Sequence, residues 1–253
     1  MTTVLVEARE RVLIITLNRP DRRNAIDRAT SQAVADALDR LDAEAGLSVG
    51  ILAGAGAHFC AGMDLKAFLA GERVELPGRG LAGLTSAPPQ KPLIAAVEGY
   101  ALAGGFELAL ACDLLVASDT ATFGLPEVKR GLIAGSGGLL RLPERLPRPL
   151  AMELALTGRM MPAAEAARWG MVNRLCPAGT ALETALALAD DIAANAPLAL
   201  IASKRLVAEG PRWPADDLWS RQDAALEPVI ASEDAREGAR AFVEKRPPVW
   251  TGT

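Results

Sequence analysis

The sequence predicts an α/β protein in which a mainly parallel sheet is followed by a helical C-terminal part. The chain has 253 residues, half of them hydrophobic and 23% charged, which suits a globular protein with a sizeable core. Short apolar runs alternate with segments of helical spacing over roughly the first 150 residues. After that point the composition changes to alanine-rich segments with helical periodicity.

The first predicted elements are a hairpin and a helix. The runs TVLVEA and RVLIITLN predict two strands joined by a short turn at residues 9–11. Apolar residues then recur at helical spacing from Asp27 to about Ala45, which predicts a helix. Three later runs, VGILAGAG, PLIAAVEG and DLLVAS, predict buried strands. Their continuous apolar character is typical of parallel sheets that are covered on both faces.

The segment from Ala70 to Lys91 is rich in glycine and proline. We expect it to be a mobile excursion over the functional site rather than core, with at most one short helix near Leu81 to Thr85. Later helices are predicted within PAAEAARWGMV, GTALETALALADDIAANAP, LALIASKRLVAEG and SEDAREGARAFVEKRPP.

Charge and composition argue against several protein classes. The net charge is −4, from 27 basic and 31 acidic residues, without the basic stripe of a nucleic-acid binder. No apolar run reaches the ~18 residues of a membrane span, and the N-terminus does not resemble a secretory signal. Three cysteines without a CxxC pair and a single histidine predict no metal site and favour a reducing, cytoplasmic setting.

Glu107 is the first candidate for catalysis. It lies in ALAGGFELALACD, where an ionised carboxylate among apolar residues is costly to bury unless it is needed. A helix beginning near Gly104 and Gly105 would present free N–H groups that could hold a developing negative charge. A carboxylate that merely caps such N–H groups is the alternative, and it stays open at this point.

Glu127 is the second candidate. It lies in FGLPEVKRGLIAGSGG, before a glycine-rich turn from Gly135 to Gly138. Two carboxylates in loops of one domain could hold a water molecule between them for acid–base chemistry.

Other chemistries have weaker support. Gly54 and Gly56 suggest a dinucleotide-binding turn, but Phe59 stands where that fingerprint needs glycine. His58 and Cys60 could form a thiol nucleophile with its base, although a buried structural cysteine is the more common case. The run AGSGG resembles a nucleophile elbow, yet no histidine follows His58 to complete a triad.

Motifs along nearly the whole chain resemble the crotonase, or enoyl-CoA hydratase/isomerase, superfamily. They are LNRPDRRNAI, FCAGMDLKAF, KPLIAAVEGYALAGGFELALACDLLVAS, FGLPEVKRGLIAGSGGLLRL, LTGRMMPAAEAARWGMVNRL, NAPLALIASKRLV and SEDAREGARAFVEKRPPVW. The resemblance implies an α/β, crotonase-like spiral of ββα units with a C-terminal helical trimerisation part. It places the α/β core at residues 1–190 and the helical part at residues 191–253.

The resemblance also implies reversible hydration of a trans-2-enoyl-CoA thioester, without metal or redox cofactor. The backbone N–H groups of Met63 and Gly104 would form an oxyanion hole for the thioester oxygen. Glu107 would take a proton from water, Glu127 would deliver one to Cα, and the Gly135 N–H would orient the water. Coenzyme A enters only as part of the substrate.

Further positions match those that bind coenzyme A in the family. Near the phosphates and the pantetheine arm these are Arg22 or Arg23 and the backbone of Ala25; along the adenine loop they are Ala61, Asp64, Leu65 and Lys66. Phe242 and Lys245 match residues that reach the coenzyme A of a neighbouring subunit. The family assembles as trimers, often paired into hexamers, so we expect a homotrimer or hexamer without nucleic-acid or membrane partners.

The presence of both glutamates favours a hydratase, because isomerases of the family commonly keep only the later one. Within the hydratases, the glycine-rich motifs and the C-terminal motif resemble the carnitinyl-CoA dehydratase branch more than the enzymes of short-chain fatty-acid metabolism. Hydration of crotonobetainyl-CoA, isomerisation and non-catalytic acyl-CoA binding are therefore the alternatives. A trimethylammonium substrate would need an aromatic or acidic pocket, and the segment from Ala70 to Lys91 is expected to shape it.

Overall fold

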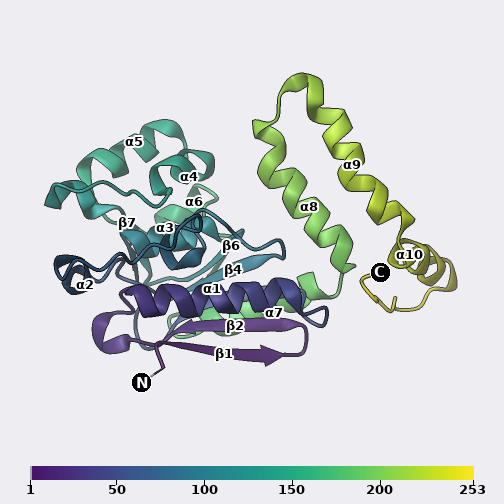
Figure 1. Cartoon of the computed structure of the whole chain (residues 1–253), viewed down its shortest axis with the longest axis horizontal. Coiled ribbons are helices and arrows are strands. Elements are labelled where there is room, and N and C mark those ends of the chain that lie inside the picture. The colour runs from purple at the N-terminus through teal and green to yellow at the C-terminus, as the bar shows by residue number, and fades with distance from the viewer. Residues whose placement is uncertain (1) are drawn as a thin grey trace.

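The computed structural model describes residues 2–253 and contains two sheets with helices around them (Figure 1). The large sheet has the strand order β1-β2-β3-β4-β6-β9. Its strands are β1 (Val4–Arg9), β2 (Val12–Leu17), β3 (Val49–Gly54), β4 (Leu93–Val97), β6 (Leu114–Ser118) and β9 (Arg174–Cys176). The small sheet has the order β5-β7-β8, with β5 (Tyr100–Leu102), β7 (Thr122–Gly124) and β8 (Met161–Pro162).

The N-terminal hairpin and the parallel strands confirm the predicted α/β class. β1 pairs antiparallel with β2, and the remaining neighbours in the large sheet pair in parallel. The α-helix α1 (Arg28–Ala43) begins after Asp27, whose carboxylate accepts a hydrogen bond from the Thr30 N–H. The order β1, β2, α1 and the order β4, β5, α3 each form a ββα unit, with α3 spanning Gly104–Ala111.

Helices cover both faces of the large sheet, as the apolar strands predict. One face packs against α7 (Ala181–Ala193), which presents alanines at every fourth position to the strands. The other face contributes to the main core together with α1, α3 and the residues beneath the small sheet. The remaining helices around this body are α2 (Leu65–Leu69), α4 (Gly138–Arg145), α5 (Arg148–Thr157) and α6 (Ala163–Arg168), with 3₁₀ turns η1 (Pro20–Arg22), η2 (Leu81–Gly83) and η3 (Pro126–Arg130).

The segment from Ala70 to Lys91 differs from its prediction. The short helix is present as η2, but the expectation that the segment lies outside the core is wrong. Its apolar side chains are buried in the main core: Val74, Leu76, Leu81, Ala82 and Leu84. Glycine and proline allow the irregular path, and backbone hydrogen bonds between Leu76 and Gly80 satisfy its polar groups. The segment is therefore an ordered wall and not a loose cover.

The C-terminal helices form an arm that stands apart from the body (Figure 1). It consists of α8 (Pro197–Glu209), α9 (Leu218–Ala231) and α10 (Glu233–Glu244), with the 3₁₀ turns η4 (Gly210–Arg212) and η5 (Ala215–Asp217) between α8 and α9. The strands do not end near residue 150, since β8 and β9 come later in the chain. Neither of these strands was predicted, and nor were α4, α5 and α9.

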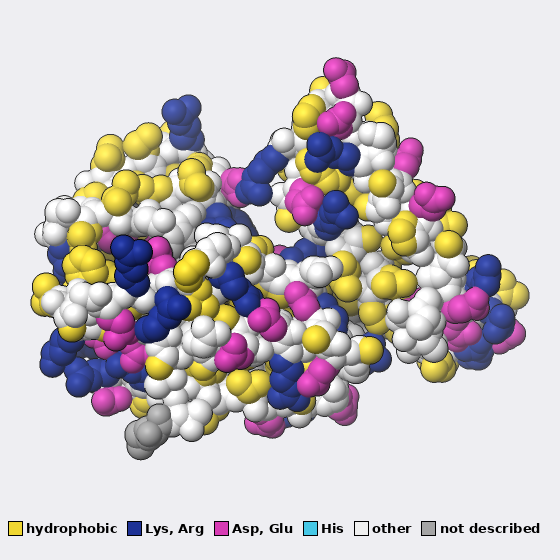
Figure 2. Space-filling view, viewed as in Figure 1, with side chains coloured by type: hydrophobic (Ala, Val, Ile, Leu, Met, Phe, Trp, Pro, Cys, Tyr) yellow, Lys and Arg dark blue, Asp and Glu magenta, His cyan; other side chains and the backbone are white. Residues whose placement is uncertain are grey.

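Two ion pairs connect the arm to the body. Lys204 on α8 lies 2.7 Å from Asp113, and Arg212 lies 2.6 Å from Glu144 on α4. Between these contacts the surface is hollowed, and apolar side chains are visible on both the body and the arm (Figure 2).

Candidate active site

Helix α3 places Glu107 in the interior. All eight residues of the helix are buried, and the Glu107 side chain lies in its first turn with only 3% of the residue exposed. A Cβ at Gly105 would collide with the carbonyl oxygen of Cys60, so glycine is required for this close approach. Glu107 thus lies on the helix that was expected to begin near Gly104, and the description of both carboxylates as loop residues is wrong for Glu107.

Two backbone N–H groups lie side by side at the start of this helix. Within residues 2–253, neither the Met63 N–H nor the Gly104 N–H donates a hydrogen bond. The Cβ position of Gly104 lies 3.5 Å from the Met63 nitrogen, and that of Gly62 lies 3.0 Å from the Gly104 nitrogen. Gly104 and Glu107, three residues apart on one helix, share a face. The arrangement can hold an oxyanion beside a carboxylate.

The backbone before Gly104 is strained. Ala103 adopts a φ of 51° and a ψ of −130°, a region that favours glycine. This conformation turns the chain from β5 into α3, at the point where Gly104 comes close to Met63. Alanine thus adopts a glycine-like geometry at this position.

The turn after η3 holds the Glu107 carboxylate. Its Oε1 accepts hydrogen bonds from the N–H groups of Ser136 and Gly138, each at 2.8 Å. Since Gly138 is the first residue of α4, Oε1 also caps that helix. The capping interpretation of Glu107 is therefore true of one oxygen, whereas Oε2 receives no hydrogen bond from the described residues and stays available.

Glu127 lies in η3, close enough to Glu107 for the two charges to interact. Its Oε2 atom is buried and has no hydrogen-bond partner among residues 2–253. A buried carboxylate oxygen without a partner is costly unless a proton, a water molecule or a substrate satisfies it. The atom thus indicates where a reacting group can bind.

Both carboxyl groups have raised pKa values. Burial raises the pKa of Glu107 to about 7; the two N–H groups that donate to it oppose this shift, and the charge of Glu127 adds to it. Burial also raises the pKa of Glu127, against the opposing effect of its own backbone N–H and of Arg130. Carboxyl groups whose pKa is raised in this way suit the exchange of protons with a substrate.

An arginine that sequence analysis missed joins the two loops of the expected coenzyme A site. The guanidinium of Arg19 lies 2.9 Å from Asp64 and 3.1 Å from Asp27, and it donates to the carbonyl oxygen of Ala25. Asp64 also caps α2 by accepting from the Lys66 and Ala67 N–H groups. Burial would raise the pKa of Asp64, but these hydrogen bonds outweigh burial and lower it.

The predicted coenzyme A residues fall into two groups. Those from the N-terminal part lie together, because the Ala61 N–H donates to the Arg23 carbonyl at 2.9 Å and Ile26 pairs with Met63. Arg22, Arg23, Leu65 and Lys66 are exposed there, while the Asp64 carboxylate is occupied within the protein. Phe242 and Lys245, on the exposed side of α10, are not brought to this site within one chain (Figure 1).

Gly135 takes a smaller part in the site than its neighbours. It is exposed, and its N–H donates to no acceptor among the described residues. The groups that contact Glu107 are Ser136 and Gly138, which the sequence analysis had left unused inside the same GSGG run. A third carboxylate, Glu75, was also missed: its Oε1 accepts a hydrogen bond from Ser136 Oγ at 2.8 Å.

The thiol-nucleophile alternative is wrong. Cys60 is buried, which raises the pKa of its thiol to about 12, and its Sγ contacts the Asn24 carbonyl rather than His58. His58 instead stacks on Tyr100, with ring centroids 4.5 Å apart, and accepts a hydrogen bond from the Tyr100 N–H. A group of three or more side chains able to hold a metal ion does not occur within residues 2–253.

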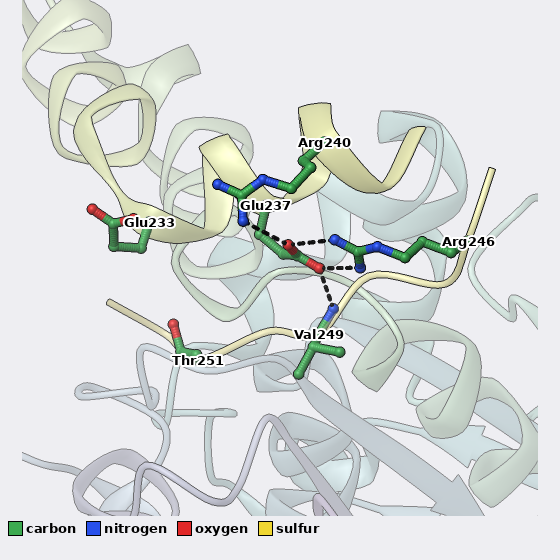
Figure 3. A pocket seen from close by; sticks show the side chains of 6 residues that line it. All are labelled: Glu233, Glu237, Arg240, Arg246, Val249 and Thr251. Atoms are coloured by element: carbon green, nitrogen blue, oxygen red, sulfur yellow. Dashed lines mark hydrogen bonds and ion pairs between the residues drawn. The ribbon is translucent and has the colours of Figure 1, made fainter. Parts of the chain in front are cut away.

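A cavity of about 300 Å³ lies away from this site, between α10 and the C-terminal tail (Figure 3). Its centre is Glu237, which accepts from Arg246 at 2.6 and 2.9 Å and from the Val249 N–H at 3.0 Å. The hydrogen bonds from Arg246, followed by that from Val249, lower the pKa of Glu237 to about 2. Because these charges satisfy one another, the cluster fastens the tail to α10 and offers no open binding group.

Among residues 2–253, no single helix is long and apolar enough to span a membrane; α7 with the α8–η4 segment meets the criteria only as a pair bent by 108°.

Comparisons with known proteins match nearly the whole chain. The family model described as enoyl-CoA hydratase/isomerase matches residues 7–253. Carnitinyl-CoA dehydratase from Proteus mirabilis is 44% identical over 249 residues, covering 95% of each chain. The crystal structure of an enoyl-CoA hydratase from Mycobacterium marinum is 62% identical, covers 100% of both chains and has a TM-score of 0.99. That of a carnitinyl-CoA hydratase from Mycobacterium avium is 48% identical with the same coverage and a TM-score of 0.80.

Proposed function

The chain belongs to the enoyl-CoA hydratase/isomerase family, and from this premise we propose that it catalyses the reversible addition of water to an enoyl-CoA thioester. It is a hydro-lyase. The observation that carries the proposal is that the N–H groups of Met63 and Gly104, which donate to no acceptor within residues 2–253, lie side by side at the start of the helix that carries the buried carboxylate of Glu107. Glu127 adds a second carboxylate with an unsatisfied oxygen.

The reaction needs a base, an acid and an oxyanion site. The thioester oxygen accepts hydrogen bonds from the Met63 and Gly104 N–H groups. Ionised Glu107 takes a proton from water through Oε2 while the oxygen of that water bonds to Cβ of the enoyl group. Electrons of the double bond move to the thioester oxygen, and protonated Glu127 returns a proton to Cα. Each oxyanion donor in such sites contributes roughly 3 kcal/mol to barrier lowering.

These steps move only protons and the elements of water, so the proposed reaction requires neither a metal nor a redox cofactor. The assignment of Glu107 as base and Glu127 as acid follows the family resemblance, and burial raises the pKa of both carboxyl groups, which suits proton exchange. Glu107, with a pKa raised to about 7, is ionised in part at neutral pH and can act as the base. The presence of both carboxyl groups supports hydration over isomerisation.

A second candidate is hydration of an enoyl-CoA whose acyl group carries a trimethylammonium. It is favoured by the relatives named carnitinyl-CoA dehydratase and carnitinyl-CoA hydratase, at 44% and 48% identity. The two candidates share the same chemistry and differ only in the acyl group.

We propose that coenzyme A binds along the two loops that Arg19 joins. Ala25 and Ala61 would offer backbone groups, while Arg22, Arg23 and Lys66 supply exposed positive charge for phosphates. The site would be completed in a homotrimer or hexamer, where Phe242 and Lys245 of one subunit reach the coenzyme A of the next. The 86% exposure of Phe242 supports this assembly. The buried free thiols of Cys60, Cys112 and Cys176 support a reducing, cytoplasmic location.

The test is turnover of a panel of enoyl-CoA esters, followed by mass spectrometry for the gain of one water. We expect hydration by the wild type, with turnover reduced at least ~100-fold in Glu107→Gln and in Glu127→Gln. Binding of a saturated acyl-CoA should survive in both variants. Near-normal turnover in either variant would contradict its assigned role, and absence of turnover on every ester by the wild type would overturn the proposed function.

A further inference from the structure

The ordered segment that follows α2 borders the reacting atoms at three points. A Cβ at Gly104 would lie 2.6 Å from Leu81 Cδ2, so Leu81 packs directly against the oxyanion position. The Thr85 carbonyl accepts from Arg141 at 2.6 Å, and Arg141 in turn lies against Gly137. The third point is Glu75, through its hydrogen bond to Ser136 Oγ. An acyl group that extends from the oxyanion hole past Glu107 must pass this segment.

Glu75 is held in place by its neighbours. Val74 and Leu76 on either side are buried, while the Glu75 side chain faces outward. Its carbonyl oxygen accepts a hydrogen bond from Arg28 at 2.8 Å, which fixes the backbone. The carboxylate therefore stands on an ordered strand-like segment and is not a freely moving surface charge.

Ser136 connects Glu75 to the base. The N–H of Ser136 donates to Glu107 Oε1 and its hydroxyl donates to Glu75 Oε1, each at 2.8 Å. Two carboxyl groups are thus held by the two polar groups of one residue. The charge of Glu75 contributes to the raised pKa of Glu107, which is consistent with this proximity.

Glu75 forms no ion pair with a cation of the residues that the structure describes. Within residues 2–253, no lysine or arginine forms an ion pair with it, and its second carboxylate oxygen receives no hydrogen bond. The nearby Arg141 points its guanidinium at the Thr85 carbonyl. Beside a plain hydrocarbon tail, such a carboxylate would lose water without compensation, which is unfavourable.

We infer that Glu75 determines acyl specificity and selects an acyl group that carries a positive charge on its γ-carbon. This deepens the proposed function and rests on it. The γ-carbon is bonded to the β-carbon that water attacks, and that water is held by Glu107. A cation at the γ-carbon therefore lies near Glu107, and Ser136 links the Glu107 carboxylate to that of Glu75 through two hydrogen bonds of 2.8 Å. A quaternary ammonium cannot donate a hydrogen bond, so a carboxylate within Coulomb range is a suitable partner.

The test compares two saturated esters that cannot be hydrated, butanoyl-CoA and γ-trimethylammoniobutanoyl-CoA, by titration calorimetry. They differ only in the cation. We expect the wild type to bind the cationic ester more tightly than the neutral one. Glu75→Gln should weaken binding of the cationic ester about tenfold and leave binding of the neutral ester unchanged. Gln keeps the acceptor for Ser136 Oγ and removes only the charge.

Glu72→Gln is the matched control, because Glu72 lies on the same segment but its carboxylate accepts from the Arg28 N–H at 2.5 Å. It removes an equal charge and should leave the preference between the two esters intact. A similar loss in Glu72→Gln would mean that overall charge, and not Glu75, sets the preference. If Glu75→Gln weakened binding of both esters equally, Glu75 would only position Ser136 and would not recognise the cation. Both results would overturn the inference.

Turnover of the corresponding enoyl esters separates the inference from the proposed function. Hydration of the neutral ester with no preference for the cationic one, in binding or in turnover, would overturn the inference and leave the proposed function standing. Hydration of neither ester would overturn the proposed function, while the calorimetric comparison would still decide whether Glu75 recognises the cation.

Discussion

Glu107 meets opposing requirements of stability and chemistry. Its carboxylate is buried among apolar residues, and burial raises its pKa from an ordinary 4.5 to about 7. A folded-state pKa above the unfolded value stabilises the protein below about pH 4.5, and that stabilisation is lost as the pH rises through about 7. At higher pH the folded protein must therefore hold a charge that the unfolded chain holds more easily.

Replacing Glu107 by Gln should make the protein more stable at high pH. The expected gain in the free energy of unfolding is near zero at pH 4 and reaches up to about 3 kcal/mol at pH 8, because Gln does not ionise. Denaturant unfolding of both proteins across this pH range measures the difference. A difference that does not change with pH would show that ionisation of Glu107 carries no cost.

Because Gly138 has no side chain, it leaves room for the Glu107 carboxylate. A Cβ at this position would lie 2.8 Å from Glu107 Cγ and 3.0 Å from Oε1. We expect Gly138→Ala to shift the carboxylate and reduce kcat by about tenfold or more, since misplacement of a catalytic group is costly. Gly46→Ala is the control, because its Cβ would meet nothing within 4 Å. Equal kcat in both variants would contradict this role.

At the scale of elements, Arg19 joins the N-terminal caps of two helices. Asp27 caps α1 and Asp64 caps α2, and both carboxylates lie within ion-pair distance of the same guanidinium. Since α2 follows directly after Met63, Arg19 also fixes the loop that carries one oxyanion donor.

Arg19→Ala should therefore weaken both stability and substrate binding. Two partly buried carboxylates would lose their partner, with an expected loss of about 1–3 kcal/mol in the free energy of unfolding and a raised KM. Arg40→Ala removes an exposed pair with Glu44 at the end of α1 and should cost clearly less stability than Arg19→Ala, because solvent screens exposed pairs. Similar losses in the two variants would argue against a special role of Arg19.

Sequence patterns within a short stretch predicted the elements that depend mainly on neighbouring residues. The hairpin, α1 and strands β3, β4 and β6 follow from apolar runs and helical spacing, and the motif around Glu107 indicated the start of α3. Arg19 was missed because its partner Asp64 is 45 residues away in the sequence. Helix α9 was missed because none of its residues is buried in the chain and Pro228 interrupts its pattern. The wall after Ala70 was misjudged because glycine and proline obscured the buried apolar residues between them.

At the scale of the whole molecule, the C-terminal arm exposes more apolar surface than is expected of helices that face only solvent. Val207 and Trp219 are 78% and 73% exposed, and Phe242 is 86% exposed. Apolar surface of this extent is typical of protein interfaces. The ion pairs of Lys204 and Arg212 fasten the arm to the body without covering these side chains.

Phe242→Ala should weaken assembly without unfolding the chain. If Phe242 is buried by another copy, the variant should dissociate at concentrations where the wild type stays assembled, as measured by light scattering after size-exclusion chromatography. Leu5→Ser, on the exposed side of β1, should leave the assembly unchanged. An unchanged mass for Phe242→Ala at every concentration would exclude this side chain from the interface.

The alanines of α7 have a consequence far from where they lie. Ala181, Ala185, Ala189 and Ala193 set how closely the helix approaches the sheet, and α8 leaves the end of α7 at a sharp bend. A helix of 13 residues is about 20 Å long, so a tilt of α7 by about 5° would swing the far end of α8 by about 2 Å. The alanine methyl groups therefore set the distance between α7 and the sheet, and through it the direction in which α8 leaves the body. Replacing one of these alanines by a bulkier residue would change the direction of the arm. A substitution buried in the body would thus alter the proposed contact between two copies of the chain.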